Sequence, residues 1–409
     1  MEKLPPEIKT NILARLPFRS IAQCKSVSKP WYTLLSDPAF HSFQLTNHLT
    51  NPNLDIILVH ESGPSIYYLE INGLDTIPVN PSPFKVFDSE FICESLPEDE
   101  PYTFPSILGA YNGFICLSVT QKIDDSYYLP ANPIWVVNPI TEERFELPLY
   151  SVPETDIPYE LVESDLLAVV KYVRFFSGFG FEDSRNEFKL VLIMFYLCDH
   201  RREVYGNEVQ VHTLGSDNWR RKVGVVPEVL RESCVRAVFV SGCLHWVTVD
   251  VNSSTNEPII LSFDLCGEEF GDVSIPKLKR PYKDYRLGVF EDCLSFVESS
   301  NNLVQIWIMQ TYGIRESWVK RFSIKKGSLH TYWNTCPQVD IIKFCKNGKL
   351  LLLWNGKYIV AYDVTSKRSR YVEVKGVDVE SRQAFPFVGS LLSLDSACRI
   401  RSETEEIRK

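Results

Sequence analysis

Most of this 409-residue chain alternates apolar and polar residues with a period of two, and short turn pairs interrupt the alternation. Asn112-Gly113, Ser241-Gly242 and Glu291-Asp292 each separate two apolar runs, as the turn of a β-hairpin does. The pattern therefore predicts a succession of antiparallel strand pairs. Hairpins are expected at 54–71, 109–119, 178–193, 237–249, 287–297 and 341–354.

A second kind of strand pair follows most of these hairpins, at 135–148, 209–222, 259–276, 304–324 and 358–374. Two hairpins make four strands, and this four-strand unit recurs at spacings of about fifty residues, which is typical of the blades of a β-propeller. About six blades are expected, with seven as the alternative because the first unit is poorly formed. A helix longer than two turns is expected after residue 50 only within 161–173.

The amino-terminal segment has a different period. Ile8, Ile12 and Leu16 recur at every fourth position after two prolines, which predicts a helix with one apolar face. Two further short helices are expected within about forty residues, and three such helices bury too little surface to be stable alone. The segment must therefore dock onto the rest of the chain or onto another protein.

Capping residues predict where these two further helices begin. Ser20 with Gln23 forms a capping box and predicts a second helix that starts after Ser20. Ser28 is expected to cap a third helix, which tolerates Pro30 because a proline in the first turn removes no hydrogen bond of the helix.

Three sequence patterns within residues 4–40 go further than periodicity. They are L-P-x-E at the start, I-L-x-R-L-P in the middle and V-x-K-x-W near the end, and together the segment resembles an F-box. The resemblance implies docking on the Skp-type adaptor of a cullin ubiquitin ligase. By matching positions, the docking or supporting residues are Leu4, Pro5, Ile8, Ile12, Leu13, Leu16, Pro17, Ile21, Val27 and Trp31. Some of these residues must form the internal core of the segment instead.

A second resemblance covers residues 54 to 395. The motifs G-x-x-N-G, W-x-x-N-P, G-F-G-F, S-x-x-W-R, G-x-L-H-W and S-F-D-L follow one another in an order similar to that of the F-box-associated, kelch-like domain of plant F-box proteins. The expected fold is α+β multidomain, a small all-α F-box followed by an all-β propeller-like domain. The expected divisions are an F-box at 1–45, a linker at 46–53, the β-domain at 54–395 and a charged tail at 396–409.

Candidate catalytic and metal-binding residues have simpler interpretations. Glu268 and Glu269 are interpreted as solvated turn residues rather than an acid–base pair, since adjacent strand residues point to opposite faces. His245 lies in an alternating strand and is interpreted as structural. The eleven cysteines include no C-x-x-C pair, and those within apolar strands, such as Cys116, Cys243 and Cys293, are expected to be buried and reduced. No catalytic residue, metal or cofactor is predicted.

Charge and the irregular parts of the chain bear on partners. The formal charge of −9 does not favour nucleic acid or anionic membranes, and no signal or membrane segment is expected. Insertions at 88–105, 149–173, 198–208 and 250–258 interrupt the units, and such insertions usually carry recognition. The six carboxylates of 88–105 suggest a basic patch on the target, and a merely solvated loop is the equal alternative.

The leading hypothesis is therefore a non-catalytic substrate adaptor of a Skp-cullin-F-box ubiquitin ligase, located in the cytoplasm or nucleus. Its partners would be a Skp-type adaptor, a cullin reached through that adaptor, and an unknown target protein. The alternative from another class is a propeller enzyme such as a hydrolase. A third hypothesis keeps the adaptor architecture but places a glycan or small-molecule ligand at the mouth of the propeller.

Overall fold

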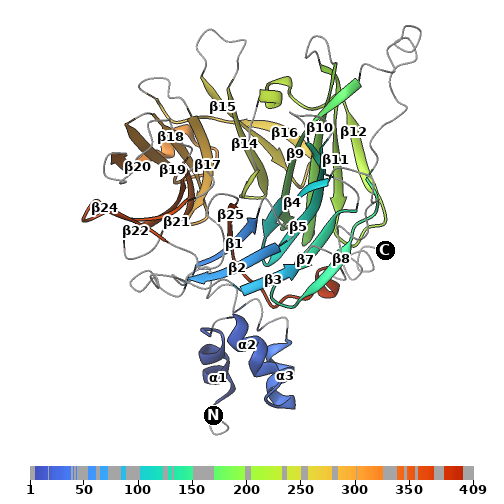
Figure 1. Cartoon of the computed structure of the whole chain (residues 1–409), viewed down its shortest axis with the longest axis vertical. Helices are drawn as coiled ribbons and strands as arrows, with labels where there is room; N and C mark the ends of the chain where they lie inside the picture. The colour runs from blue at the N-terminus through green and yellow to red at the C-terminus, as the bar shows by residue number, and fades with distance from the viewer. Residues whose placement is uncertain are drawn as a thin grey trace.

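A computed structural model of the chain places a small group of helices beside sheets that are arranged radially (Figure 1). The amino terminus lies at the tip of the helical group, and β25, near the carboxyl end of the chain, lies among the central strands. The structure describes residues 5–16, 18–37, 40, 43, 54–60, 65–71, 84–88, 102–122, 128–130, 133–150, 170–198, 204–232, 237–249, 257–278, 284–300, 302–325, 339–344, 348–354, 358–372 and 382–398.

The helical segment consists of α1 (Pro6–Leu13), α2 (Phe18–Lys25) and α3 (Lys29–Leu35). Ser28 caps α3 as predicted, because its hydroxyl accepts a hydrogen bond from the backbone N–H of Trp31 at 3.4 Å. Pro30 lies in the first turn of α3, also as predicted. The capping box at Ser20 is wrong. Helix α2 already begins at Phe18, so Ser20 lies inside its first turn instead of preceding it.

The strands form antiparallel sheets whose order mostly follows the chain. The first sheet contains β25 (Arg382–Phe387), β1 (Leu54–His60), β2 (Ser65–Ile71) and β3 (Phe84–Asp88), and the second contains β4 (Tyr102–Tyr111), β5 (Phe114–Lys122), β7 (Trp135–Asn138) and β8 (Glu143–Glu146), with β6 (Tyr128–Pro130) beside β5. The third contains β9 (Val170–Glu182), β10 (Glu187–Cys198), β11 (Val204–Thr213) and β12 (Trp219–Val223), and the fourth contains β13 (Val238–Val240), β14 (Cys243–Val249), β15 (Pro258–Asp264) and β16 (Glu269–Val273). The fifth contains β17 (Asp284–Phe290), β18 (Cys293–Ser299), β19 (Leu303–Met309) and β20 (Trp318–Lys325), and the last contains β21 (Val339–Phe344), β22 (Lys349–Trp354), β23 (Tyr358–Asp363) and β24 (Arg368–Tyr371). Two short 3-10 helices, η4 (Glu228–Glu232) and η5 (Arg315–Ser317), lie between strands.

The number of regular four-strand blades differs from the prediction. The described strands form five four-stranded sheets rather than six, and the sheet of β4, β5, β7 and β8 has five strands because β6 pairs with the far end of β5. In addition, the sheet that contains β1 takes its first strand, β25, from the carboxyl end of the chain. The propeller is thus closed by pairing between residues 55–60 and 382–387.

Two of the predicted hairpin turns are confirmed by their backbone angles, while 61–64 and 345–347, in the turns of two other predicted hairpins, lie outside the described residues. Asn112 and Gly113 have φ values of 49° and 87°, and Ser241 and Gly242 have values of 52° and 76°. Two consecutive positive φ angles give a turn whose twist matches that of the flanking strands. The helix expected at 161–173 is wrong where it is described, because Val170 to Val173 belong to β9.

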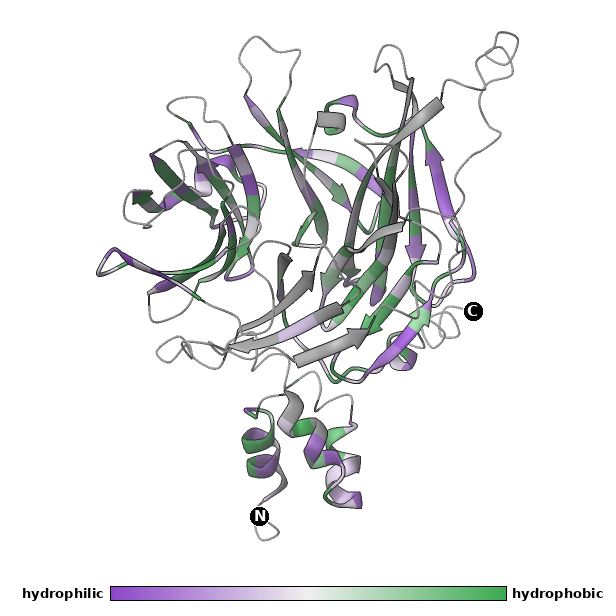
Figure 2. Ribbon diagram, in the orientation of Figure 1, coloured by the Kyte–Doolittle hydropathy of each residue, from purple (hydrophilic) through white to green (hydrophobic). Residues whose placement is uncertain are grey.

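Apolar residues fill the space between neighbouring sheets. Leu192 of β10 belongs to the apolar cluster shared with β5 and β7, whereas Val191 belongs to the cluster shared with β14 and β15. Strand β10 thus buries both of its faces, and Figure 2 shows hydrophobic residues along the inner strands and hydrophilic residues on outer strands such as β12. Trp219 and Trp318 act as packing anchors, since each indole N–H donates to a carbonyl beside the preceding sheet, of Pro148 and Ser274, both at 2.7 Å.

The turns within the hairpins gather at one rim of the propeller. The β9–β10 and β15–β16 turns meet there, with 3.8 Å between Ser184 Oγ and Cys266 Sγ. The chain after β25 lies at the same rim, where Ser390 faces the turn at Gly113 and Cys398 faces Gly215. We call this the helix-side rim, because the helices contact the chain after β25.

The insertions expected from the sequence start at the opposite rim. Because successive strands are antiparallel, the β3–β4, β8–β9, β10–β11 and β14–β15 connections leave from strand ends that point away from the helix-side rim. These connections correspond to the insertions at 88–105, 149–173, 198–208 and 250–258, most of which fall outside the described residues.

Candidate functional site

Exposed large apolar side chains are concentrated in the helical segment. Of thirteen such residues in the described chain, five lie within residues 8–43, namely Ile8, Ile12, Val27, Tyr32 and Phe43, with exposed fractions of 38–65%. Ile8 and Ile12 are four residues apart on α1 and therefore share one face of that helix. Such a density of exposed apolar groups is typical of a protein–protein docking surface. We call these five residues the exposed apolar set.

Other apolar residues of the segment form a small internal core. Leu13 and Ile21 are 1% and 0% exposed, and they pack with Ala14, Leu35 and Phe40. Leu16 and Trp31 are half-buried against the same cluster. The three helices thus use one part of their apolar surface to hold each other and leave another part uncovered.

The structure therefore divides the residues predicted for docking. Ile8, Ile12, Val27 and Pro5 are exposed, Leu13 and Ile21 are buried, and Leu16 and Trp31 lie between the two groups; Leu4 and Pro17 fall outside the described side chains. Sequence reasoning missed Tyr32 and Phe43. The signal for Tyr32 was present, because Trp31, Leu34 and Leu35 define the inward face of α3 and Tyr32 does not belong to it.

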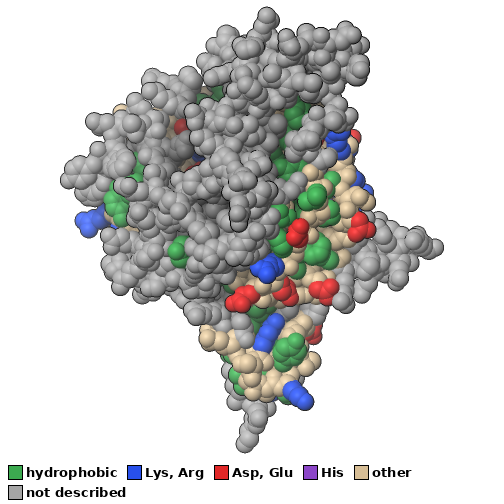
Figure 3. All heavy atoms as spheres, turned by 45° about the vertical axis from the view of Figure 1, so that its right-hand side comes forward, with side chains coloured by type: hydrophobic (Ala, Val, Ile, Leu, Met, Phe, Trp, Pro, Cys, Tyr) green, Lys and Arg blue, Asp and Glu red, His purple; other side chains and the backbone are tan. Residues whose placement is uncertain are grey.

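The helical core is completed by two residues of the β-domain. Leu391, which follows β25, is buried in the core of the helical segment, and Ile140, from the β7–β8 turn, packs against it. Lys25 at the end of α2 lies near Glu143; burial lowers the pKa of the lysine, and the carboxylate offsets part of this shift. Figure 3 shows acidic side chains on the β-domain just above the helices. The helical segment is therefore seated on the helix-side rim.

Asn138, from the W-x-x-N-P motif, holds the two parts of this seat together. Its side-chain oxygen accepts from the backbone N–H groups of Ile140 and Thr141, at 2.9 and 3.3 Å. Its amide nitrogen donates to the carbonyls of Ser390 and Leu392, at 3.0 and 2.8 Å. One fully buried side chain thus fixes both the β7–β8 turn and the chain after β25.

Glu143 adds a second link between the same segments. Its Oε2 atom accepts a hydrogen bond of 2.7 Å from the backbone N–H of Leu394, at the start of the helical turn 394–398. Leu394 and Ala397 then bury their side chains in the apolar cluster between the sheets of β5 and β10. The carboxyl-terminal segment up to Cys398 is therefore part of the folded domain.

Glu268 is not the solvated turn residue that was predicted. Its side chain is 11% exposed and lies between Arg220, to which it is hydrogen-bonded, and the fully buried Lys189, 3.3 Å from Oε1. Burial opposes ionisation of Glu268, but the two cations outweigh it and keep its pKa below the usual value. Because β10 and β12 belong to one sheet and Glu268 to the next, the cluster joins two blades.

His245 has a structural environment, as predicted. Its Nε2 atom lies 2.7 Å from the hydroxyl of Tyr312, and Nδ1 lies 3.1 Å from the carbonyl of Val238. Burial lowers the pKa of His245 to about 4, although hydrogen bonds with backbone groups act in the opposite direction. The ring is therefore neutral at physiological pH and joins β14 to the β19–β20 turn.

The cysteines differ in part from expectation. Cys116 is buried, but Cys243 and Cys293 are only partly buried, because each begins a strand directly after a turn at the helix-side rim. The six cysteines whose side chains the structure describes are free. Within the described residues, no three potential ligands among His, Cys, Asp and Glu are grouped to hold a metal ion, and no helix is long and apolar enough to cross a bilayer.

These features define a β-propeller protein that carries on one rim a helical segment with an exposed apolar surface. Residues 1–43 match the family model of the F-box domain, and residues 84–396 match that of the F-box associated beta propeller domain. The chain therefore belongs to the F-box proteins with an F-box-associated β-propeller domain.

Relatives in Arabidopsis thaliana agree with this assignment. F-box protein At3g07870 is 28% identical over 400 residues, covering 89% of this chain and 85% of that protein. F-box protein CPR1 is 26% identical over 394 residues, covering 92% and 85%. Among solved structures, a post-proline cleaving enzyme from Rickettsia typhi has 8% identity and a TM-score of 0.36 over 92% of this chain and 62% of that one, which is too distant to support an argument.

Proposed function

We propose that this protein is the substrate-recognition adaptor of a Skp-cullin-F-box ubiquitin ligase. The observation that carries the proposal is the exposed apolar set on a segment that matches the F-box domain. A Skp-type adaptor would cover Ile8, Ile12 and the neighbouring exposed residues, while Leu13 and Ile21 would support them from inside the segment. The propeller would hold a target protein, and other subunits would transfer ubiquitin to it.

The contribution of such an adaptor is positional. Holding a target near the ubiquitin carrier converts an encounter between two molecules into a local reaction, which is the usual gain from proximity. The seat formed by Leu391, Ile140 and Asn138 suits this role, because a fixed F-box gives the target a defined position relative to the ligase. The proposed site of action is the cytoplasm or nucleus.

A pair of charge substitutions on α1 tests the docking surface. Ile12→Asp places a charge where the adaptor would bury an apolar side chain, and we expect it to cost about 2–5 kcal/mol of binding and to abolish co-purification with a Skp-type adaptor. Asn11→Asp adds the same charge at the neighbouring exposed position and is expected to retain the adaptor. Both variants should keep the circular dichroism spectrum of the β-domain.

The results separate docking from the alternatives. If Ile12→Asp binds the adaptor as tightly as wild type, the docking assignment is wrong. Deletion of residues 1–45 provides a further test, because an adaptor loses its ligase partners while keeping its target, whereas a propeller enzyme retains its activity. Mass spectrometry of the partners retained by the deleted chain would identify target candidates.

A further inference from the structure

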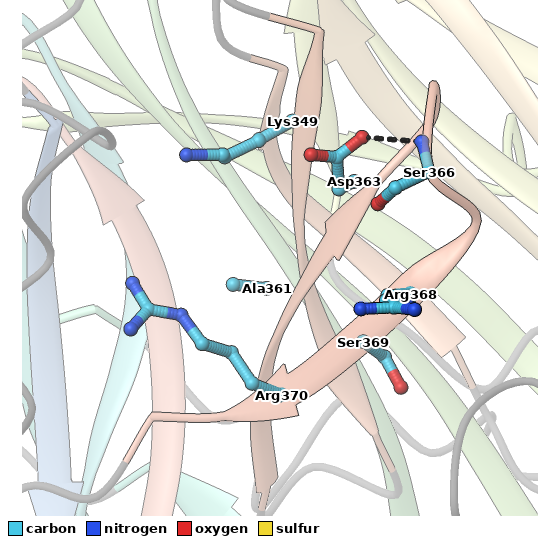
Figure 4. A pocket seen from close by; sticks show the side chains of 7 residues that line it. All are labelled: Lys349, Ala361, Asp363, Ser366, Arg368, Ser369 and Arg370. Carbon is cyan, nitrogen blue, oxygen red and sulfur yellow. Dashed lines mark hydrogen bonds between the residues drawn. The ribbon is translucent and has the colours of Figure 1, made fainter.

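The last blade of the propeller contains a hollow of about 190 Å³ on the outer part of its sheet. Strand pairing places Lys349, Asp363 and Arg368 opposite one another across β22, β23 and β24. In the next row on the same face, Ala361 of β23 lies opposite Arg370 of β24. The small side chain of Ala361 forms the floor of the hollow, and longer side chains surround it (Figure 4).

Positive charge predominates around this hollow. Three of its lining residues are basic, Lys349, Arg368 and Arg370, and one is acidic, Asp363. From residue 349 to 371 the chain has five basic residues and one acidic residue, a balance of +4 in a protein whose overall charge is −9. The last blade is therefore locally attractive to anions even though the whole molecule is not.

The single carboxylate is already used by the fold. Asp363 Oδ1 accepts hydrogen bonds from the backbone N–H groups of Thr365 and Ser366, both at 2.9 Å, and thereby closes the β23–β24 turn. These bonds hold the pKa of Asp363 below its usual value. Figure 4 shows Lys349 and Arg370 extending in one direction on either side of Ala361, while Asp363 lies toward Ser366. The cations thus border a part of the hollow that Asp363 does not occupy.

This arrangement fits one class of ligand. A guanidinium group donates two parallel hydrogen bonds to a carboxylate or phosphate, and an ammonium group adds a compact charge. Ser366 and Ser369 also line the hollow. Because the site lies on the outer surface of a sheet, an extended peptide can reach it, whereas an enclosed pocket would favour a small molecule.

We propose that this hollow binds the anionic side chains of an acidic or phosphorylated peptide segment in the protein that the propeller holds. The proposal rests on the proposed function, in that the bound protein is taken to be the target of the ligase. Carboxylate and phosphoryl groups share the required chemistry, and Lys349 and Arg370 are the residues that would contact them. The site lies at the β23–β24 turn, on the helix-side rim.

Fluorescence anisotropy with three labelled peptides of equal length tests this proposal, using the full chain bound to a Skp-type adaptor. One peptide is rich in glutamate, one contains phosphoserine, and one is neutral and rich in glutamine. We expect an anionic peptide to bind and the neutral one not to bind. Lys349→Gln with Arg370→Gln should weaken binding about tenfold, which corresponds to about 1.4 kcal/mol.

A second double variant removes the same charge at positions outside the hollow. Lys367→Gln with Arg321→Gln alters exposed residues that do not line the hollow, and it should change the affinity by less than about twofold. Binding of the phosphoserine peptide alone would identify phosphoryl groups as the ligand, and binding of both anionic peptides would include carboxylates. Equal losses in the two double variants, or equal binding of the neutral peptide, would overturn the proposal.

The outcome is separable from that of adaptor docking. Ile12→Asp should lose the Skp-type adaptor and still bind the anionic peptide, because the hollow is on another part of the molecule. If wild type keeps the adaptor but binds no anionic peptide, the hollow is not a peptide site and the ligase proposal is unaffected.

Discussion

Replacing Asn138 with aspartate should detach the carboxyl-terminal segment from the β7–β8 turn with almost no change in side-chain volume. Aspartate keeps an oxygen that accepts from the N–H groups of Ile140 and Thr141, so the turn itself is preserved. It places a second oxygen, instead of a donor, against the carbonyls of Ser390 and Leu392. The substitution therefore acts on the link between the two segments.

The magnitude follows from the buried groups involved. Each carbonyl that loses its donor in a buried site costs about 1–3 kcal/mol, and Asn138 is fully buried. A buried carboxylate that faces two carbonyls adds a desolvation cost. We expect the free energy of unfolding to fall by about 3–5 kcal/mol in total. Since Leu391 lies between Ser390 and Leu392, the seat of the helical segment should weaken as well.

Urea unfolding followed by tryptophan fluorescence measures the loss of stability, and hydrogen exchange of residues 388–398 and α2 measures the loosened seat. Asn218→Asp is the matched control, because it makes the same chemical change at an exposed turn position. A free energy of unfolding within about 1 kcal/mol of wild type, or equal to that of the control, would refute the role assigned to Asn138.

Two further predictions concern the helix-side rim and pH. Gly113→Ala should destabilise the protein by more than about 2 kcal/mol, because φ is 87° at this position and an added Cβ atom would lie 2.2 Å from the Cβ atom of Ser390. Gly242→Ala is the control, because φ is 76° there but nothing lies within 4 Å, so urea unfolding of the two variants separates the clash from the backbone strain. Equal losses of stability in the two variants would contradict the predicted clash with Ser390. His245 has a pKa of about 4 when folded and about 6.5 when unfolded, so the unfolded chain takes up a proton first, and stability falls as the pH drops from 6.5 to 4, by about 3 kcal/mol in all. His245→Gln should lose this part of the pH dependence between pH 7 and 5 in urea unfolding, and an unchanged slope would show that the histidine does not carry it.

The sequence was most informative where structure depends on near neighbours. The period of two predicted the strand pairs, and turn pairs such as Asn112-Gly113 predicted the hairpins, because positive φ angles and alternating burial are properties of a few consecutive residues. Ser28 predicted the start of α3 for the same reason. The resemblance of residues 4–40 to an F-box identified the segment, and the family model confirmed it.

Local pattern failed where the outcome depended on residues far apart in the chain. The sequence marks Ile8, Ile12 and Leu13 alike as apolar residues of one helix, and only the packing of Leu13 against Ile21 and Leu391 separates the core from the exposed apolar set. The sequence indicated a solvated Glu268 because the partners of this residue, Lys189 and Arg220, lie in another blade.

The closure of the ring shows most clearly the difference between local and long-range determinants of this fold. Local sequence patterns specify the strands, their turns and the helical segment that matches the F-box. Only the folded ring pairs β25 with β1 and brings Asn138 to the chain near Ser390, over 250 residues away. No local periodicity encodes such contacts, because they form only when the whole ring brings its two ends together. The position of the F-box on the rim follows from that closure.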